Sequence, residues 1–156
     1  MAALKRVLRF LKYTQHQKLY YSYNQGLELV LNGYSDADFA GDKTDRKSTS
    51  GYVFKLSGST ICWRSRKQKA VATSTVKAEY MALSMACKQH LWLTGALKEL
   101  QGPNFAAALA CDNKRTMDLV YNPRISDRSK HIDVVYYHLR DSVEEGKLVM
   151  IYVPSE

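Results

Sequence analysis

The chain has 156 residues, of which 46% are hydrophobic and 24% charged, and both values are typical of a single globular domain. Its 23 Lys and Arg against 15 Asp and Glu give a formal net charge of +8, which favours a polyanionic partner, either nucleic acid or an anionic membrane. The sequence has no signal-peptide pattern and no apolar run of the roughly 18–20 residues that a membrane span needs, so we expect an intracellular protein, cytoplasmic or nuclear, that is not secreted.

The first part of the chain predicts one helix followed by strands. Leucine and valine recur on one face of residues 3–13 and basic residues lie elsewhere, which indicates an amphipathic helix that packs on a neighbour or binds nucleic acid. Strands are predicted at residues 18–23, 27–39, 50–57 and 59–64. A turn at 24–26 separates the first two, a polar loop covers 40–49, and Ser57-Gly58 predicts a hairpin between the last two.

The rest of the chain predicts helices that alternate with strands. A long helix over 74–100 begins at Ser74 or Thr75 and ends before Gly102-Pro103. The further predicted elements are a buried strand at 105–111, helices at 113–121 and 129–145, and a last strand at 147–153. Hairpins followed by helix–strand crossovers predict an α/β fold with a mixed sheet and helices packed against it.

The cysteines favour core positions over disulfides or zinc ligands. Cys62, Cys87 and Cys111 lie far apart in apolar segments without a C-x-x-C pair, and the histidines show no ligand spacing with them. We therefore expect three free, packed cysteines and no zinc site.

Three acidic residues stand where packing alone would not place them. Asp36 ends a strand of buried residues, Asp112 ends an apolar run before a helix, and Glu79 faces the sheet from the long helix. The alternatives are a solvated strand end for Asp36, a helix N-cap for Asp112 and an exposed position for Glu79. A buried carboxylate is costly without a cation, so one shared metal site at the strand ends explains all three better. Carboxylates that hold Mg²⁺ are typical of phosphoryl chemistry.

Five longer motifs follow one another along the chain. They are G-Y-S-D-A-D-F-A-G-D at 33–42, D-R-K-S-T-S-G-Y-V-F at 45–54, S-R-K-Q-K-A-V-A-T-S-T-V-K-A-E-Y-M-A-L at 65–83, C-D-N at 111–113 and S-K-H-I-D-V at 129–134. In this order they resemble the ribonuclease H region of copia-type retrotransposon Pol polyproteins, from about residue 2 to residue 155. Residues 1–23, an expected helix and strand, resemble the tail of a reverse-transcriptase connection, and residues 24–156 resemble the ribonuclease H-like domain.

The resemblance implies a ribonuclease H-like fold, a five-stranded mixed sheet flanked by helices. It also implies cleavage of the RNA strand of RNA/DNA hybrids during reverse transcription, by acidic residues that hold two Mg²⁺ (or Mn²⁺) ions. Matched by motif, Asp36 is the first-strand aspartate that bridges both ions, and Glu79 and Asp112 each hold one. The implied partners are the hybrid and the reverse-transcriptase domain of the same polyprotein, with no membrane.

The resemblance further implies a fourth carboxylate, on a helix after the last strand, and the sequence stops where we expect that helix to begin. Asp133 belongs to a family motif but precedes the last strand, and Glu156 is a weaker substitute. Two hypotheses therefore remain: an active, metal-dependent endoribonuclease, or a catalytically impaired ribonuclease H fold that binds nucleic acid or a protein. The three retained acids favour the first, and the missing carboxylate and the altered residues after C-D-N favour the second.

Basic residues near these acids are the candidate contacts with a hybrid, and the densest group has a solvated loop as its alternative. The densest group, which leads into the helix of Glu79, is Arg64, Arg66, Lys67 and Lys69. The second candidates, in the loop after Asp36, are Lys43, Arg46 and Lys47, and Asn113 is a short polar residue that could contact a 2′-hydroxyl of the RNA strand. A third cluster is Arg124, Arg128, Lys130 and His131.

Overall fold

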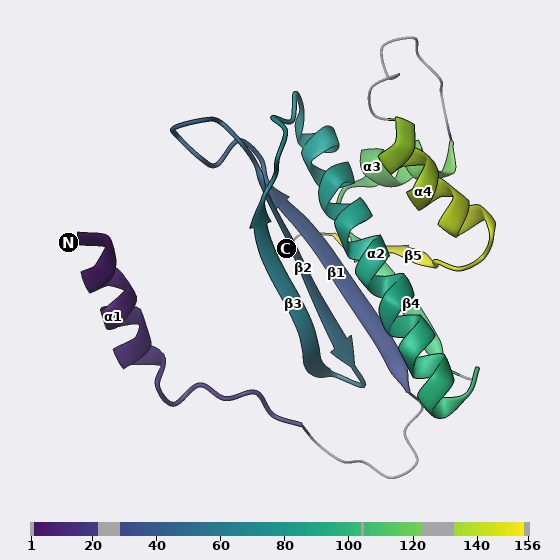
Figure 1. The fold of residues 1–156 in the computed structure, drawn as a ribbon, viewed down its shortest axis with the longest axis horizontal. Helices are drawn as coiled ribbons and strands as arrows, with labels where there is room; N and C mark the ends of the chain where they lie inside the picture. The colour runs from purple at the N-terminus through teal and green to yellow at the C-terminus, as the bar shows by residue number, and fades with distance from the viewer. Residues whose placement is uncertain (1, 22–28, 104, 123–132, 155–156) are drawn as a thin grey trace.

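Five strands form one mixed sheet in the order β3-β2-β1-β4-β5 (Figure 1). The computed structural model describes residues 2–21, 29–103, 105–122 and 133–154. The strands are β1 (Val30–Asp38), β2 (Thr49–Leu56), β3 (Ser59–Lys67), β4 (Ala106–Cys111) and β5 (Met150–Tyr152). β1 pairs antiparallel with β2 and parallel with β4, so the sheet changes from antiparallel to parallel at β1. The predicted fold class and the five-stranded mixed sheet are confirmed.

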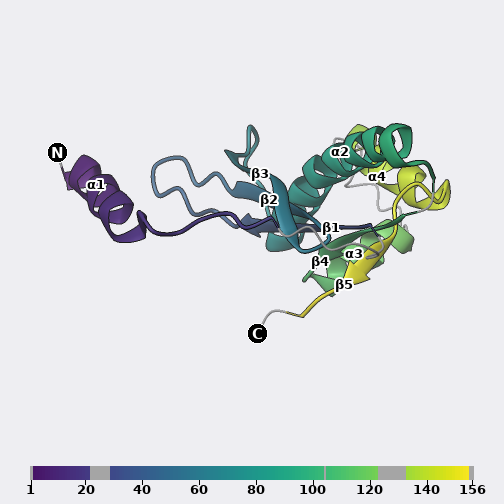
Figure 2. The same cartoon turned by 90° about the horizontal axis from the view of Figure 1, so that it is seen from below.

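Helix α2 (Thr75–Gln101) lies along β1 and β2 on one face of the sheet (Figures 1 and 2). The Ser74 side chain accepts a backbone N–H of its first turn, and the helix ends at Gly102 with a φ of 84°, as the sequence predicts. Two shorter helices, α3 (Lys114–Tyr121) and α4 (Asp133–Glu144), pack on each other and on α2. Within the described ranges, no helix has both the length and the apolar character that crossing a bilayer requires.

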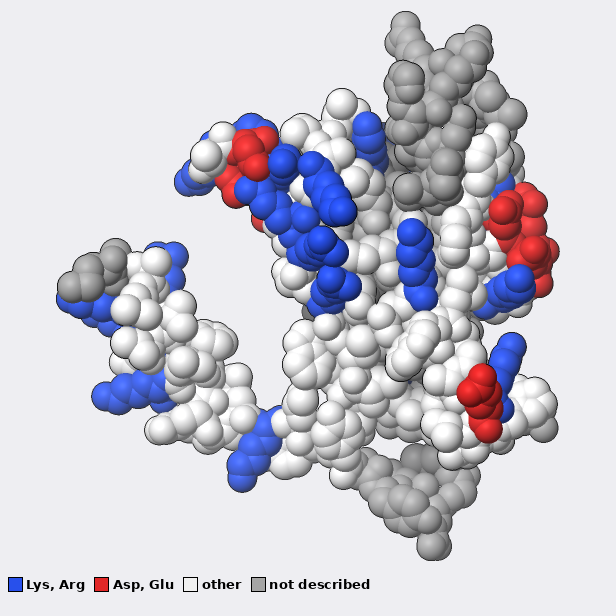
Figure 3. Space-filling model, in the orientation of Figure 1, with Lys and Arg blue, Asp and Glu red and all other residues white. Residues whose placement is uncertain are grey.

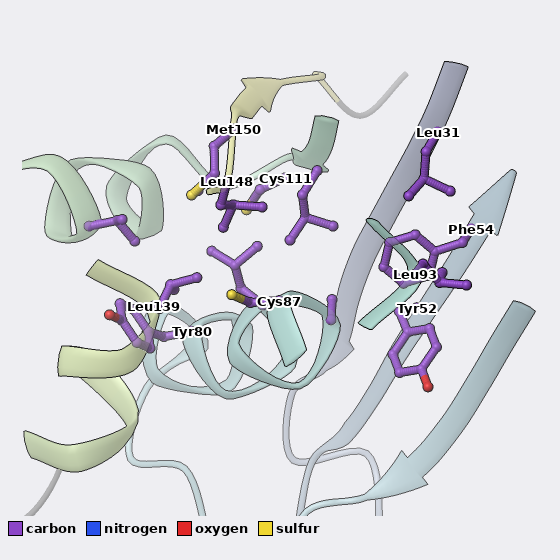
Figure 4. Packing of buried hydrophobic residues seen from close by; sticks show 14 residues of the cluster. Leu31, Tyr52, Phe54, Tyr80, Cys87, Leu93, Cys111, Leu139, Leu148 and Met150 are labelled. Atoms are coloured by element: carbon purple, nitrogen blue, oxygen red, sulfur yellow. The ribbon is translucent and has the colours of Figure 1, made fainter. Parts of the chain in front are cut away.

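The hydrophobic core lies between α2 and the sheet (Figure 4). Leu31, Phe54, Leu83 and Leu109 are fully buried there. Gly33 lets these side chains close over β1, because a Cβ at that position would lie 2.8 Å from Cδ1 of Leu109 and closer still to the Phe54 ring. This packing holds β1 and α2, the two elements that carry Asp36 and Glu79, against each other.

The three cysteines are unpaired. Cys87 and Cys111 belong to the core, whereas Cys62 is half-buried beside it. Burial raises the pKa of the Cys111 thiol to about 11, so the thiol stays protonated at neutral pH. The expectation of free, packed cysteines is confirmed.

The β2–β3 hairpin turns at Ser57 and Gly58, as predicted. Both residues have a positive φ, 47° and 88°, which suits the type I′ turn that follows the twist of antiparallel strands. β3 continues to Lys67, beyond the predicted end at residue 64, because Arg66 and Lys67 pair with the first residues of β2. Arg64, Arg66 and Lys67 are therefore the end of an edge strand, which corrects the alternative that treated them as a loop, whereas Lys69 lies just beyond the strand.

Helix α1 (Ala2–Thr14) forms as predicted, but it lies apart from the sheet in both ribbon views (Figures 1 and 2). Leu4, Val7, Leu8 and Leu11 are all more than half exposed. The expected packing of this apolar face on a neighbour is therefore absent from the described part of the chain.

One predicted strand is wrong where it can be compared. Residues 18–21 form no regular structure, although a strand is predicted over 18–23. Three further predictions lie outside the described residues: the turn at 24–26, the boundary between residues 23 and 24, and residues 129–132 of the last predicted helix. The third basic cluster, Arg124 to His131, lies outside them as well.

Candidate metal centre

Asp36 and Asp112 occupy equivalent places on two neighbouring parallel strands. The pairing of β1 with β4 ends at Tyr34 opposite Ala110, and the same register continued by two residues sets Asp36 beside Asp112. In β1 the neighbours Ser35 and Ala37 are buried and Asp36 is exposed, as the alternation of a strand requires. The two carboxylates thus share one end of the sheet, where β1 and β4 stop pairing.

Glu79 reaches this end of the sheet from α2. Ala78 and Ala82 of the helix cluster with Ala37 and Ala72, and these small side chains let the helix approach β1 closely. Glu79 is left with 9% of its surface exposed, so the alternative of a solvated helix position is wrong.

The three carboxylates converge. Each offers one oxygen, and these oxygens all lie within 4.8 Å of one another. Burial raises the pKa of Glu79 to about 7, and the charges of Asp36 and Asp112 add to the increase. The backbone N–H of Ala37 donates to Oδ1 of Asp36 over 2.8 Å, which orients that carboxylate.

The residues present fit a divalent cation. Oε2 of Glu79 is buried and has no hydrogen-bond partner among the described residues. A buried carboxylate oxygen in that state beside two further carboxylates is the environment that a cation stabilises. Oxygen donors alone are the ligands that Mg²⁺ and Mn²⁺ prefer. Asp36, Glu79 and Asp112 would therefore be the residues that hold such an ion.

Asn113, rather than Asp112, caps helix α3. The Asn113 side chain accepts from the N–H of Thr116 over 3.0 Å, which makes Asn113 the N-cap. The alternative that explained Asp112 as a cap is therefore wrong. The same hydrogen bond occupies the amide oxygen of Asn113, so a contact of Asn113 with a hybrid would use its NH₂ group.

A fourth carboxylate is not found near the three within the described part of the chain. Asp133 begins α4, but its side chain lies outside what the structure describes, and so does Glu156. The role of either residue stays a hypothesis.

The basic candidates lie on β3, just after it and on the loop before β2, where lysine and arginine gather on one face of the molecule (Figure 3). The row Asp36–Gly51–Ser65 crosses β1, β2 and β3, so Arg64 and Arg66 flank the strand position level with Asp36. Neighbouring strands are about 4.8 Å apart, which puts this position roughly 10 Å from β1.

Two of these cations are paired with acids of the loop. Lys67 forms ion pairs with Asp42 and, over 3.0 Å, with Asp45, and Lys47 lies 3.6 Å from Asp45. The hydrogen bond from Lys67 lowers the pKa of Asp42 to about 2. Lys67 and Lys47 are therefore partly neutralised, whereas Arg64, Arg66, Lys69, Lys43 and Arg46 form no ion pair with a described acid.

Lys88 is a further cation that sequence reasoning missed. It projects from α2 beside Arg66 and Lys69, and the three residues line one cavity. Met81, Ser84, Met85 and Lys88 recur at helical spacing on one flank of α2, and this periodicity is the signal that could have indicated it.

Comparisons with known proteins give relatives for nearly the whole chain, and no family model matches it. The chain is 39% identical over 153 residues to the retrovirus-related Pol polyprotein from transposon TNT 1-94 of Nicotiana tabacum, which covers 98% of the chain and 11% of the polyprotein. It spans about a tenth of the length of the transposon polyproteins that it matches. It is also 51% identical over 100 residues to secreted RxLR effector protein 161 of Plasmopara viticola, which covers 64% of the chain and 69% of that protein.

Solved structures share the fold at low identity. LC11-RNase H1, isolated from compost, matches with a TM-score of 0.57 and 16% identity, over 80% of this chain and 84% of that one. The same protein in complex with an RNA/DNA hybrid matches with a TM-score of 0.53, 16% identity and coverage of 80% and 85%. These likenesses show a ribonuclease H fold.

Proposed function

Because the chain belongs to the retrovirus-related Pol polyproteins of copia-type retrotransposons, we propose that it cleaves the RNA strand of RNA/DNA hybrids at the carboxylate cluster. The observation that supports this most directly is the convergence of Asp36, Glu79 and Asp112 within 4.8 Å at the end of β1 and β4. Structural packing alone would not bring three acids together around a buried oxygen of Glu79 that has no hydrogen-bond partner in the described part of the chain.

The proposed reaction is hydrolysis of a phosphodiester. Water attacks the phosphorus, one P–O bond breaks, and the products are a hydroxyl end and a phosphate monoester end. Divalent cations held by the cluster would stabilise the charge that develops on the phosphate oxygens. Asp36, fixed by the Ala37 N–H, and Asp112 define the two sides of the site, and Glu79 closes it from the helix side. We propose two Mg²⁺ or Mn²⁺ ions, with Asp36 as the ligand common to both.

We propose that the hybrid lies over the basic face of β3. The proposed phosphate contacts are first the cations that form no ion pair with a described acid, and the two paired lysines would join them when their acids release them. The cations without an ion pair to a described acid are Arg64, Arg66, Lys69, Lys43 and Arg46, and the paired ones are Lys47 and Lys67. Asn113, beside Asp112, is a further proposed contact through its amide group. Such contacts position a duplex without reading its sequence.

The reverse-transcriptase domain of the same polyprotein is the proposed protein partner. The exposed apolar residues of α1 support this, because an amphipathic helix is stable chiefly when that face is covered. We propose that residues 1–23 belong to the connection with that domain and that residues 24–156 form the ribonuclease H-like domain. Hydrogen exchange should show α1 unprotected in this chain and protected when the preceding part of the polyprotein is joined to it.

A strand-specific cleavage assay tests the proposed activity. An RNA/DNA hybrid labelled on either strand is incubated with Mg²⁺ or Mn²⁺, and only the RNA strand should be shortened. Hybrid binding without cleavage in either ion would instead support the second candidate, an impaired ribonuclease H fold that binds nucleic acid. That candidate is favoured by the absence of a fourth carboxylate from the cluster within the described residues.

A further inference from the structure

A cavity of about 310 Å³ opens between the end of β3 and the middle of α2, apart from the carboxylate cluster. Its volume is in the range of small-ligand sites. Its strand side is formed by Ser50, Arg66, Lys67, Gln68 and Lys69, and its helix side by Met81, Ser84, Met85 and Lys88. None of the three carboxylates of the cluster lines it.

Gln68 anchors the strand side of this cavity. Its side chain is buried, and Nε2 donates to Oγ of Ser50 over 2.8 Å and to the carbonyl oxygen of Ala78 over 3.0 Å. Its backbone N–H donates to the carbonyl oxygen of Ser48 over 2.8 Å. These bonds tie the end of β3 to both β2 and α2, so the cations on either side of Gln68 are held in place.

The cavity gathers positive charge that no described acid offsets. Arg66, Lys69 and Lys88 are exposed and form no ion pair with a described carboxylate, whereas Lys67 is held by Asp42 and Asp45. Three cations around one hollow repel one another and favour the binding of an anion. A phosphate group suits them, because arginine and lysine both bind phosphate oxygens through charge-assisted hydrogen bonds.

The position of the cavity relates it to the cluster. Ala37, which follows Asp36, is in register with Ser50 and then with Arg66, so Arg66 lies two strands, or about 10 Å, from β1. Lys88 comes two and a half helical turns after Glu79, which places it on the opposite flank of α2. Along the helix axis Lys88 is about 13.5 Å from Glu79. Phosphates follow each other about every 3.4 Å along the axis of a strand, so about three to four nucleotides span the separation between the cavity and the cluster.

We propose that this cavity binds a backbone phosphate of the hybrid about three to four nucleotides from the phosphate that meets the carboxylates. The proposal rests on the proposed function, and it adds a second anchoring point that includes Lys88. A phosphate held there would fix where the strand lies along α2, and thereby which phosphate reaches Asp36, Glu79 and Asp112.

Hybrid binding is the test, and Asp36→Asn is made throughout so that binding is measured without cleavage. Arg66→Ala and Lys88→Gln are each compared with Lys98→Gln, a matched charge loss on the same helix away from the cavity. Each cavity variant should weaken binding and reduce the slope of log affinity against log salt by about one unit. Lys98→Gln should change neither quantity, and all variants should melt at the parent's temperature. Equal behaviour of Lys88→Gln and Lys98→Gln overturns the proposal.

A scan with single neutral methylphosphonates along each strand of the hybrid locates the contact. The Asp36→Asn chain should bind more weakly when one particular phosphate is replaced. The chain that carries both Asp36→Asn and Lys88→Gln should bind that modified hybrid no more weakly than the unmodified one, because the two changes remove the same contact. Identical losses at every position in both chains would overturn the proposal.

Two further outcomes separate the cavity from the proposed activity. If the cavity variants and the scan behave as expected but the unsubstituted chain does not cut the hybrid, the proposed function fails and the phosphate site stands. Inorganic phosphate is the second probe, followed by the amide NMR signals of Ser50 and Gln68. Saturation by phosphate with the same affinity as the hybrid would show a site for free phosphate and overturn the assignment to nucleic acid.

Discussion

Asp36 on β1 and Glu79 on α2 come from distant parts of the sequence, yet one carboxylate oxygen of each lies within 4.8 Å of the other and of Asp112. This proximity affects the ionisation of Glu79, because burial and the two neighbouring charges raise its pKa to about 7. A folded carboxyl with a raised pKa favours its protonated form. Its contribution to stability is therefore fully present below pH 4.5 and is lost as the pH rises through about 7. In the absence of a cation, the cluster should cost stability at pH 8.

Removing one charge from the cluster should stabilise the metal-free protein. We expect Asp36→Asn to raise the free energy of unfolding at pH 8 in chelator by on the order of 1 kcal/mol, because it relieves the larger of the two repulsions on Glu79. The melting temperature should rise by about 2–4 °C. Mg²⁺ or Mn²⁺ should then stabilise the parent more than the variant. Equal responses of both proteins to the ions, with no gain in chelator, would show that the acids share no site.

His90 should make the protein sensitive to acid. It is fully buried, its Nδ1 has no hydrogen-bond partner among the described residues, and burial lowers its pKa from 6.5 to about 4. In the unfolded chain His90 binds a proton below pH 6.5, whereas in the folded chain it stays neutral until about pH 4. The free energy of unfolding therefore decreases as the pH falls across this interval. Between pH 7 and pH 5 the loss attributable to His90 should be about 2 kcal/mol.

Urea unfolding of His90→Gln and of the parent at both pH values measures this contribution. The variant should lose less stability on acidification than the parent, whatever its stability at pH 7. His16→Gln, at an exposed histidine, is the matched control and should keep the parent's pH dependence. If His90→Gln and His16→Gln lose the same amount of stability between pH 7 and pH 5, His90 is not the group responsible.

Gly33 and Gly95 should respond to alanine in opposite directions. A Cβ on Gly33 would meet the Phe54 ring and Leu109 Cδ1, whereas a Cβ on Gly95 of α2 would meet nothing within 4 Å. Gly33→Ala should therefore destabilise the fold by about 1–3 kcal/mol through overpacking. Gly95→Ala should stabilise it by about 0.5–1 kcal/mol, because alanine favours a helix more than glycine does. Chemical unfolding checks both, and a harmless Gly33→Ala would contradict the close packing of β1 beneath α2.

Lys67 should become a better nucleic-acid contact when one of its two acids, Asp42, loses its charge. Its Nζ is held by Asp42 and Asp45, and this pairing lowers the pKa of Asp42 to about 2. Asp42→Asn should increase hybrid affinity at low salt and steepen the salt dependence by up to about one unit as Lys67 turns to phosphate. Glu99→Gln removes a charge from the far end of α2 and should leave the slope unchanged. Matching slopes for the two variants would argue that Lys67 stays out of the interface.

The sequence predicts best what depends on local chemistry. Ser74 and Gly102 bound α2 because a hydroxyl cap and a positive φ are properties of single residues. The strand predicted over 18–23 fails in residues 18–21 because tyrosine and leucine favour a strand only when another strand pairs with them. β3 extends beyond its predicted end because pairing with β2 holds a highly charged segment in the sheet, although its side chains alone do not favour a strand.

In the candidate site, too, the sequence predicts the residues marked by their local context and misses those that depend on the tertiary fold. Asp36, Glu79 and Asp112 could be selected because each is an acid in an apolar context, and the structure brings all three together. Helical spacing could place Lys88 on one flank of α2, but it could not place Lys88 beside Arg66, because that neighbourhood depends on how α2 lies across the β2–β3 pair. The capture of Lys67 by Asp42 and Asp45 likewise arises only when the loop before β2 folds back on the end of β3.

The most direct measurement is single-turnover cleavage of a hybrid labelled on its RNA strand, by the parent chain and by Asp36→Asn, in Mg²⁺, in Mn²⁺ and in chelator. We expect weak cleavage by the parent in Mg²⁺, because three carboxylates leave a second ion loosely held, and faster cleavage in Mn²⁺, which binds such oxygen sites more tightly. Asp36→Asn should reduce the rate to background in both ions, and chelator should do the same for the parent. Cleavage by Asp36→Asn at the parent's rate, or a hybrid that the parent binds and leaves intact in both ions, would contradict the assignment of the carboxylate cluster as a ribonuclease H centre.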